Sequence, residues 1–167
     1  MERKVKNSEV VRLFDLYSGD LYRFALSYLG SKQDAEDIVQ EVFIKIFIHI
    51  NKLKDENSLT TWIRNITTNT CIDALRTKNK NFITSIDQVT EEIKDEKNRS
   101  YDGIPTEQLL KFIQELPDGY RTIFNLYAID GYKYEEIAKM LACSESNVRS
   151  QFLRARKVLR EKIENYE

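Results

Sequence analysis

Residues 135–148 read Glu-Glu-Ile-Ala-Lys-Met-Leu-Ala-Cys-Ser-Glu-Ser-Asn-Val. This stretch predicts a short helix, a tight turn and a second helix, the arrangement of a helix-turn-helix motif. Ala138 is small enough for the two helices to approach closely. Ser144 is a good N-cap for the second helix, because its hydroxyl can accept from the amide of Ser146 or Asn147. The apolar contacts between the helices are expected from Ile137, Leu141 and Val148.

The second helix of the motif divides into two faces on a wheel of about 100° per residue. Its expected core face consists of Val148, Phe152, Ala155 and Leu159. The opposite face carries Ser146, Asn147, Ser150, Arg154 and Lys157, with Arg149 and Gln151 on its flanks. Arginine suits guanine, asparagine or glutamine suits adenine, and serine or lysine suits the DNA backbone. This segment favours DNA binding, and an ordinary helical hairpin with a polar outer face is the alternative.

The charge distribution supports the same interpretation. The net charge of the chain is −1, which by itself does not indicate nucleic acid. Basic residues nevertheless gather after Asn147, where the only acid up to residue 162 is Glu161. These basic residues are Arg149, Arg154, Arg156, Lys157, Arg160 and Lys162. Such a cluster beside a helix-turn-helix is typical of a DNA-binding surface, although a basic terminal helix alone is more often a solvated face.

The composition indicates an all-α protein of two small helical domains joined by a flexible linker. The chain has 167 residues, 41% of them hydrophobic, with five glycines and two prolines, and long stretches follow the helical period. We expect the first domain at residues 8–78 and the second, with the helix-turn-helix, at 105–167. The polar segment 79–104 loses the pattern and is expected to be the linker.

Nothing in the chain suggests export or membrane insertion. No run of eighteen apolar residues occurs, and residues 1–9 contain no apolar signal region. Cys71 and Cys143 fit a reducing compartment, where we expect both to be buried packing residues without a disulfide. A cytoplasmic location is therefore expected.

The first block predicts three helices. An amphipathic helix ends at Gly30, and its apolar face is expected to be Val10, Phe14, Tyr17, Leu21, Phe24 and Tyr28. Ser31 can cap the next helix, which continues to about Ile50. A third helix is expected from Ser58 to about Lys78, after a polar connection.

The second of these helices has apolar residues on both faces. The expected core face consists of Ala35, Ile38, Val39, Val42, Phe43, Ile46 and Ile50. The other face carries Asp37, Gln40, Glu41, Ile44 and Ile48. Aliphatic side chains ringed by carboxylates indicate a protein-binding surface. The alternative is that another helix of the same block covers Ile44 and Ile48.

The acidic residues of this helix do not predict a metal centre or an enzyme. Di-metal sites in helical bundles use Glu-x-x-His pairs, but the only histidine, His49, has Ile46 three residues before it. The cysteines lack metal-ligand spacing, and there is no glycine-rich phosphate loop. We therefore expect no metal, cofactor or small-molecule substrate.

The third helix presents a possible platform for single-stranded DNA. Trp62, Asn65 and Asn69 lie at helical spacing, with Thr68 beside them and Arg76 on a neighbouring stripe. An indole can stack on a base, and an amide can bond to base edges. The expected core face is separate and consists of Leu59, Ile63, Ile66 and Ala74. A tryptophan buried in the core of a small bundle is the alternative.

Together these segments resemble the extracytoplasmic-function (ECF) sigma factors of bacterial RNA polymerase. Residues 34–43 resemble the family's core-binding signature, and 61–76 resemble its promoter-melting segment. Leu116-Pro117, Tyr120-Arg121, Asp130-Gly131-Tyr132, Glu136-Ile137-Ala138 and Arg154-Ala155-Arg156 resemble its second domain. The resemblance covers nearly the whole chain except the linker and the extreme N-terminus.

The resemblance implies partners and residue roles. Asp37, Gln40 and Glu41 would contact the clamp helices of the largest polymerase subunit, with Ile44 and Ile48 in the same interface. Trp62, Asn65, Asn69 and Arg76 would engage the minus-ten element, and the loop 52–58 would hold a flipped base. Arg149, Ser150, Gln151 and Arg154 would lie on the minus-thirty-five element, with Ser146 and Asn147 beside them. The other implied partners are the flap of the second-largest subunit and an anti-sigma factor.

The sequence departs from the family pattern in three places. Ala142 and Cys143 replace the usual glycine and aliphatic residue of the turn, and Lys133 stands where a serine or threonine cap is common. Residues 66–69 are more polar than usual. Two other functions fit parts of the sequence: a stand-alone helix-turn-helix regulator, which would bind an operator without polymerase, and a pure interaction module without a DNA role.

Overall fold

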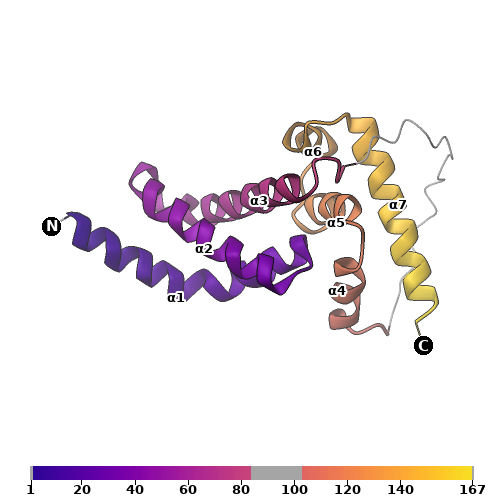
Figure 1. Ribbon diagram of the computed structural model, residues 1–167, viewed down its shortest axis with the longest axis horizontal. Coiled ribbons are helices and arrows are strands. Elements are labelled where there is room, and N and C mark those ends of the chain that lie inside the picture. Colours follow the sequence, from indigo (N-terminus) through magenta and orange to yellow (C-terminus); the bar gives the residue numbers. More distant parts are fainter. Residues whose placement is uncertain (1, 84–102, 167) are drawn as a thin grey trace. The chain divides into compact units, whose positions relative to one another are not determined.

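The computed structural model describes residues 2–83 and 103–166 (Figure 1). The chain forms two compact units, residues 1–78 and 79–167. All regular structure in the described residues is helical, which confirms the all-α prediction. None of the described helices is long and apolar enough to cross a membrane.

The first unit consists of three main helices, α1 (Glu2–Leu29), α2 (Lys32–His49) and α3 (Leu59–Lys78). Gly30 separates α1 from α2 with a φ of +68°, a conformation that glycine adopts without strain. Ser31 then caps α2 as expected, because its hydroxyl accepts a hydrogen bond from the amide of Asp34 at 3.3 Å. Two short 3₁₀ helices, Ile50–Lys52 and Glu56–Ser58, connect α2 to α3.

The core of the first unit differs in detail from the predicted faces. On α2 the prediction is confirmed at six positions, and Ile50 is half-buried. On α1, Phe14 is 44% exposed, whereas Leu13 and Ala25 are buried. The predicted core residues Leu59, Ile66 and Ala74 of α3 are only half-buried. The buried face of α3 instead carries Ile63, Thr67, Thr68, Thr70, Cys71, Ile72 and Leu75.

Threonines can occupy this core because the helix backbone satisfies two of their hydroxyls. Thr67 donates to the carbonyl of Ile63 at 2.8 Å, and Thr70 donates to the carbonyl of Ile66 at 2.7 Å. Thr68 was expected beside the exposed asparagines, but it is 1% exposed. Its hydroxyl has no hydrogen-bond partner within the described part of the chain.

The second unit contains α4 (Thr106–Gln114), α5 (Asp118–Phe124), a π-helical turn η3 (Asn125–Ile129), α6 (Tyr134–Leu141) and α7 (Glu145–Glu164). Phe112, Ile113 and Leu116 pack with Ala155 and Leu159 in its core. The side chain of Arg121 is buried beneath the turn between α4 and α5. It donates to the carbonyls of Gln114 and Leu116 at 3.1 and 2.9 Å and pairs with Asp118. The buried charge is therefore compensated.

The second unit also includes the first residues of the segment expected to be a linker. Phe82 is 7% exposed, and its carbonyl oxygen lies so close to Gly119 of α5 that a Cβ there would clash with it. Residues 79–83 therefore do not behave as free linker. Residues 84–102 of the expected linker lie outside the described residues.

The helix-turn-helix forms from α6 and α7 as predicted. Ile137, Leu141 and Val148 are buried between the helices. Ser144 caps α7 by accepting from the amide of Asn147 at 3.1 Å. The core face of α7 is also confirmed at Val148, Phe152, Ala155 and Leu159.

Both ends of α6 carry a residue that is unusual for the family, Lys133 at the start and Ala142 at the end, and the backbone accommodates both. Ala142 ends α6 in the left-handed region at φ +53° and ψ +47°. The Lys133 side chain has no acceptor and cannot cap the amides at the start of α6. The side chain of Glu136 instead accepts from the backbone before the helix. The backbone amide of Lys133 donates to the carboxylate of Glu136 at 2.7 Å. Cys143 is half-buried rather than fully buried, and Cys71 is buried as expected.

Candidate functional site

The outer face of α2 is open to solvent within the first unit. Asp37, Gln40 and Glu41 are exposed. Ile44 and Ile48 are 60% and 56% exposed, so no helix of the same block covers them. We call these five residues the α2 surface. Its aliphatic side chains lack the burial that isoleucine normally finds in a folded domain.

Lys45 joins the α2 surface to α3. Its ammonium group donates to the hydroxyl of Thr70 at 3.0 Å and pairs with the carboxylate of Glu41 at 3.0 Å. Gln33 similarly donates to Asp37 at 3.3 Å. Two carboxylates of the α2 surface are thus held by neighbouring side chains.

The exposed face of α3 carries the residues expected to meet single-stranded DNA. Asn65 and Asn69 are exposed, and Trp62 is half-buried. Arg76 is half-buried and lies 3.9 Å from Asp73. Trp62 is thus neither a core residue nor fully exposed to solvent. Before α3, the connecting loop is ordered by Asp55, whose carboxylate accepts from the amide of Asn57 at 2.9 Å.

The outer face of α7 presents most of the predicted DNA-contacting residues. Ser146 and Arg149 are exposed, whereas Asn147, Ser150 and Arg154 are half-buried. The expectation for Gln151 is wrong, because its side chain is 1% exposed. Helix α5 covers this flank of α7, and the Gln151 carbonyl oxygen lies 3.3 Å from where a Cβ of Gly119 would be. Gln151 donates to the side chain of Asn147 at 3.3 Å and so supports that residue from below.

An aromatic cluster that sequence reasoning missed lies beside Arg149. The rings of Tyr127 and Tyr134 stack with their centroids 4.4 Å apart, and Tyr127 meets Phe152 edge-on at 4.6 Å. The guanidinium carbon of Arg149 lies 5.4 Å from the centroid of Tyr134. The four residues come from three separate helical elements, so the periodicity of one helix could not reveal the cluster.

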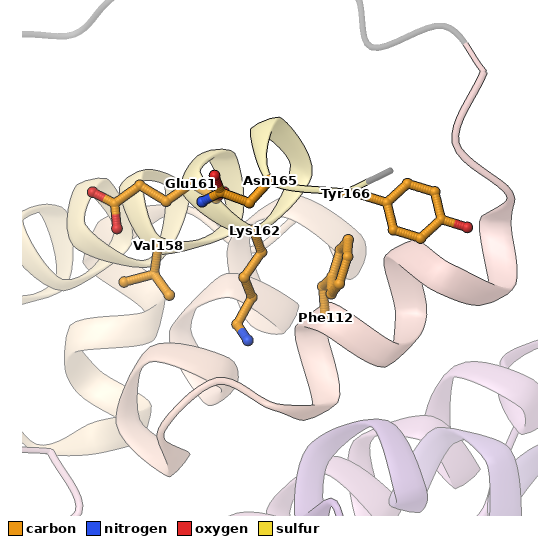
Figure 2. A pocket seen from close by; sticks show the side chains of 6 residues that line it. All are labelled: Phe112, Val158, Glu161, Lys162, Asn165 and Tyr166. Atoms are coloured by element: carbon orange, nitrogen blue, oxygen red, sulfur yellow. The ribbon is translucent and has the colours of Figure 1, made fainter.

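A groove lies between α4 and the C-terminal end of α7 (Figure 2). Its volume is about 520 Å³, and it is lined by Phe112, Val158, Glu161, Lys162, Asn165 and Tyr166. Lys162 donates to Glu115 at 2.7 Å on the rim. This hydrogen bond, together with the charge of Lys162, lowers the pKa of the Glu115 carboxyl. In the described residues, no group of three or more potential ligand side chains could hold a metal ion.

Comparison with known proteins identifies the family of the chain. Residues 13–81 match Sigma-70 region 2, and residues 106–159 match Sigma-70, region 4. The ECF RNA polymerase sigma factor SigM of Bacillus subtilis is 30% identical over 89% of this chain and 91% of its own length. The chain belongs to the ECF sigma factors. SigW of the same organism is also 30% identical, over 90% of this sigma factor and 87% of its own length.

Solved structures share the fold of this sigma factor. The sigma factor RpoE of Bartonella quintana, crystallised with the anti-sigma factor NepR, aligns with a TM-score of 0.57 and 22% identity. The alignment covers 95% of this sigma factor and 99% of that chain. CnrH in complex with the cytosolic domain of CnrY aligns with a TM-score of 0.51 and 18% identity, over 96% and 91% of the two chains.

Proposed function

We propose that this sigma factor binds core RNA polymerase through the α2 surface and directs it to promoters. The observation that carries this proposal is the exposure of Ile44 and Ile48, 60% and 56%, between Asp37, Gln40 and Glu41. Desolvated aliphatic side chains would supply affinity, and the carboxylates would select a basic partner surface. The clamp helices of the largest polymerase subunit are the expected partner.

The DNA contacts are divided between the two units. Trp62, Asn65, Asn69 and Arg76 of α3 would bind the minus-ten element as it opens. Ser146, Asn147, Arg149, Ser150 and Arg154 of α7 would bind the minus-thirty-five element. Each contact can be weak, because tethering raises the effective concentration of the second. The role requires no covalent chemistry, because stacking on flipped bases offsets the lost base pairing. The protein would act in the cytoplasm.

The groove between α4 and α7 is the proposed contact for the flap of the second-largest subunit. Phe112 and Tyr166 meet edge-on, with centroids 5.9 Å apart, and Lys162 lies over Phe112. A groove lined by both aromatic and charged side chains suits an amphipathic segment of a partner protein. The groove is lined by residues from the C-terminal part of α7 (Figure 2), whereas Ser146 and Arg149 lie near its start, so flap and DNA could be bound together.

An anti-sigma factor is a further proposed partner. RpoE, which shares this fold, was crystallised with the anti-sigma factor NepR, and the structure of CnrH was solved in complex with the cytosolic domain of CnrY. An inhibitor that covered the α2 surface would compete directly with polymerase. The apolar part of that surface is suited to such competition, because it is exposed when polymerase is not bound.

Transcription from a promoter library tests the proposed function. Core polymerase and the purified chain are incubated with a library of promoter fragments, and the initiated transcripts are sequenced. We expect initiation that depends on both components and that is lost when Asp37→Ala is combined with Glu41→Ala. The control combines Asp20→Ala with Glu164→Ala, which removes two exposed carboxylates elsewhere and is expected to leave initiation intact. Sequence-specific DNA binding by the chain alone, without initiation, would favour the stand-alone regulator instead.

A further inference from the structure

Tyr134 is the first residue of α6, and its ring faces the side chain of Arg149 from α7. We propose that Tyr134 is a positioning residue that fixes the direction of Arg149 and thereby sets the base preference of α7 at the minus-thirty-five element. The inference rests on the proposed role of Arg149 in DNA binding. It adds a residue that would not itself touch a base.

The Tyr134 ring is held in place by a series of aromatic contacts that reaches the core. It stacks on Tyr127 with an interplanar angle of 17°. Tyr127 lies against Phe152 with centroids 4.6 Å apart, and Phe152 stacks on Phe124 at 5.9 Å. Phe152 is only 7% exposed. Tyr127 itself is 37% exposed, so Tyr134 is held at the surface by stacking on a ring that packs against the core.

The π-helical turn η3 explains how Tyr127 reaches this position. Residues Asn125–Ile129 follow α5 with the wider turn of a π-helix. Such turns are rare in proteins, and those that occur are often at functional sites. Here the turn carries the Tyr127 ring, which stacks on Tyr134 and meets Phe152 edge-on. It thereby connects the aromatic core to the outer surface of the helix-turn-helix.

The contact suits an arginine that must read a base. A cation held over a ring face is attracted by the π electrons of the ring. This attraction uses none of the guanidinium N–H donors as hydrogen bonds, so they remain available to a base edge. Bidentate donation to guanine requires a fixed guanidinium direction, and a side chain already held in place loses less conformational entropy on binding. Arg149 is exposed, so a base could reach it.

The first test measures the pairing of Tyr134 with Arg149 in the full-length chain by NMR. Protons held over an aromatic ring are shifted upfield by its ring current. We expect upfield shifts for the Arg149 side-chain protons in the wild type and in Tyr134→Phe, and their loss in Tyr134→Leu. A wild-type chain without these shifts overturns the inference, whether or not the chain binds polymerase.

The second test measures base preference. Core polymerase with the wild-type or variant chain is assayed on promoters that carry each of the four bases at every minus-thirty-five position. We expect Arg149→Met to relax the preference at one or two positions. Tyr134→Leu is expected to relax it at the same positions, by about two- to fivefold, whereas Tyr134→Phe keeps it. The double variant of Tyr134→Leu and Arg149→Met should be no weaker than Arg149→Met alone.

The two tests separate failure of the inference from failure of the proposed function. A uniform loss over all promoters in Tyr134→Leu would show a merely structural role and overturn the inference. Equal behaviour of Tyr134→Phe and Tyr134→Leu would also overturn it, because the ring face would not be the active feature. If Arg149→Met does not change the base preference, both the proposed DNA role of Arg149 and the inference are wrong, even if NMR detects the pairing.

Discussion

The carbonyl oxygen of Phe82 lies against the Cα of Gly119, with no room for a side chain between them. Gly119→Ala would force the two apart, because the severe clash of the added Cβ is with a backbone oxygen and not with the end of a flexible side chain. We expect this variant to expose residues 79–83, measured as faster amide hydrogen exchange there, and to lower the melting temperature.

Gly19→Ala provides the matched control for this change. Gly19 lies within α1, and no other part of the described chain comes within 4 Å of the position that a Cβ would take there. Alanine is the better helix former, so this substitution should stabilise the chain by about 0.5–1 kcal/mol. Equal exchange at residues 79–83 in the wild type and in Gly119→Ala would contradict the close packing of Phe82.

Ala142 stores backbone strain in the turn of the helix-turn-helix. Its φ of +53° places a Cβ in the left-handed region, which costs an L-residue about 1–2 kcal/mol. Part of the gain from glycine is offset by the greater entropy of the unfolded chain. Ala142→Gly should therefore raise the free energy of unfolding by about 0.5–1 kcal/mol. Ala142→Val, with a branched side chain at the same φ, should lower it, and denaturant titration of both variants checks the sign.

The buried hydroxyl of Thr68 in the first unit has no hydrogen-bond partner among the residues that the structure describes. A buried unsatisfied polar group costs about 1–3 kcal/mol, whereas an apolar group of the same shape costs little. Thr68→Val should therefore stabilise the chain by about 1 kcal/mol. Thr67→Val, which removes the hydroxyl bonded to Ile63, should give no such gain. Thermal melts in which the two variants behave alike would contradict this distinction.

The link between Glu115 and Lys162 predicts a pH dependence of stability. The hydrogen bond from Lys162 and its positive charge lower the pKa of the Glu115 carboxyl. The stabilisation is fully present above the ordinary pKa of glutamate, and it is lost as the pH falls through the lowered pKa. Glu115→Gln should therefore lack this acid-sensitive part of the stability. Melting temperatures of both chains, recorded from neutral to acid pH, should converge as the pH falls.

Much of the fold follows from the pattern of apolar residues within single helices. The core faces of α2 and α7 and the cap at Ser144 are local features, so spacing and residue type predict them. The exposure of Ile44 and Ile48 follows in the same way, because those residues lie opposite a complete core face.

The features that sequence analysis missed depend on which neighbour lies beside a helix. Gln151 lies at the edge of a polar face, and only the packing of α5 decides that it is buried. The polar side chains of Thr67 and Thr70 did not predict a place in the core. They can be buried because their hydroxyls donate to backbone carbonyls one turn earlier. The pairing of Arg149 with Tyr134 joins residues on two helices, and the burial of Phe82 joins a supposed linker to α5.

Binding to core polymerase tests the central claim most directly. The affinity of fluorescently labelled full-length chain for core polymerase is measured by titration, for the wild type and for Ile44→Ser combined with Ile48→Ser. Both side chains are more than half exposed in the free chain, so the melting temperature should change little. The account predicts an affinity at least about tenfold lower, because a few well-packed side chains at the centre of an interface carry most of its binding energy. An unchanged affinity with an unchanged melting temperature would contradict the assignment of the α2 surface to polymerase.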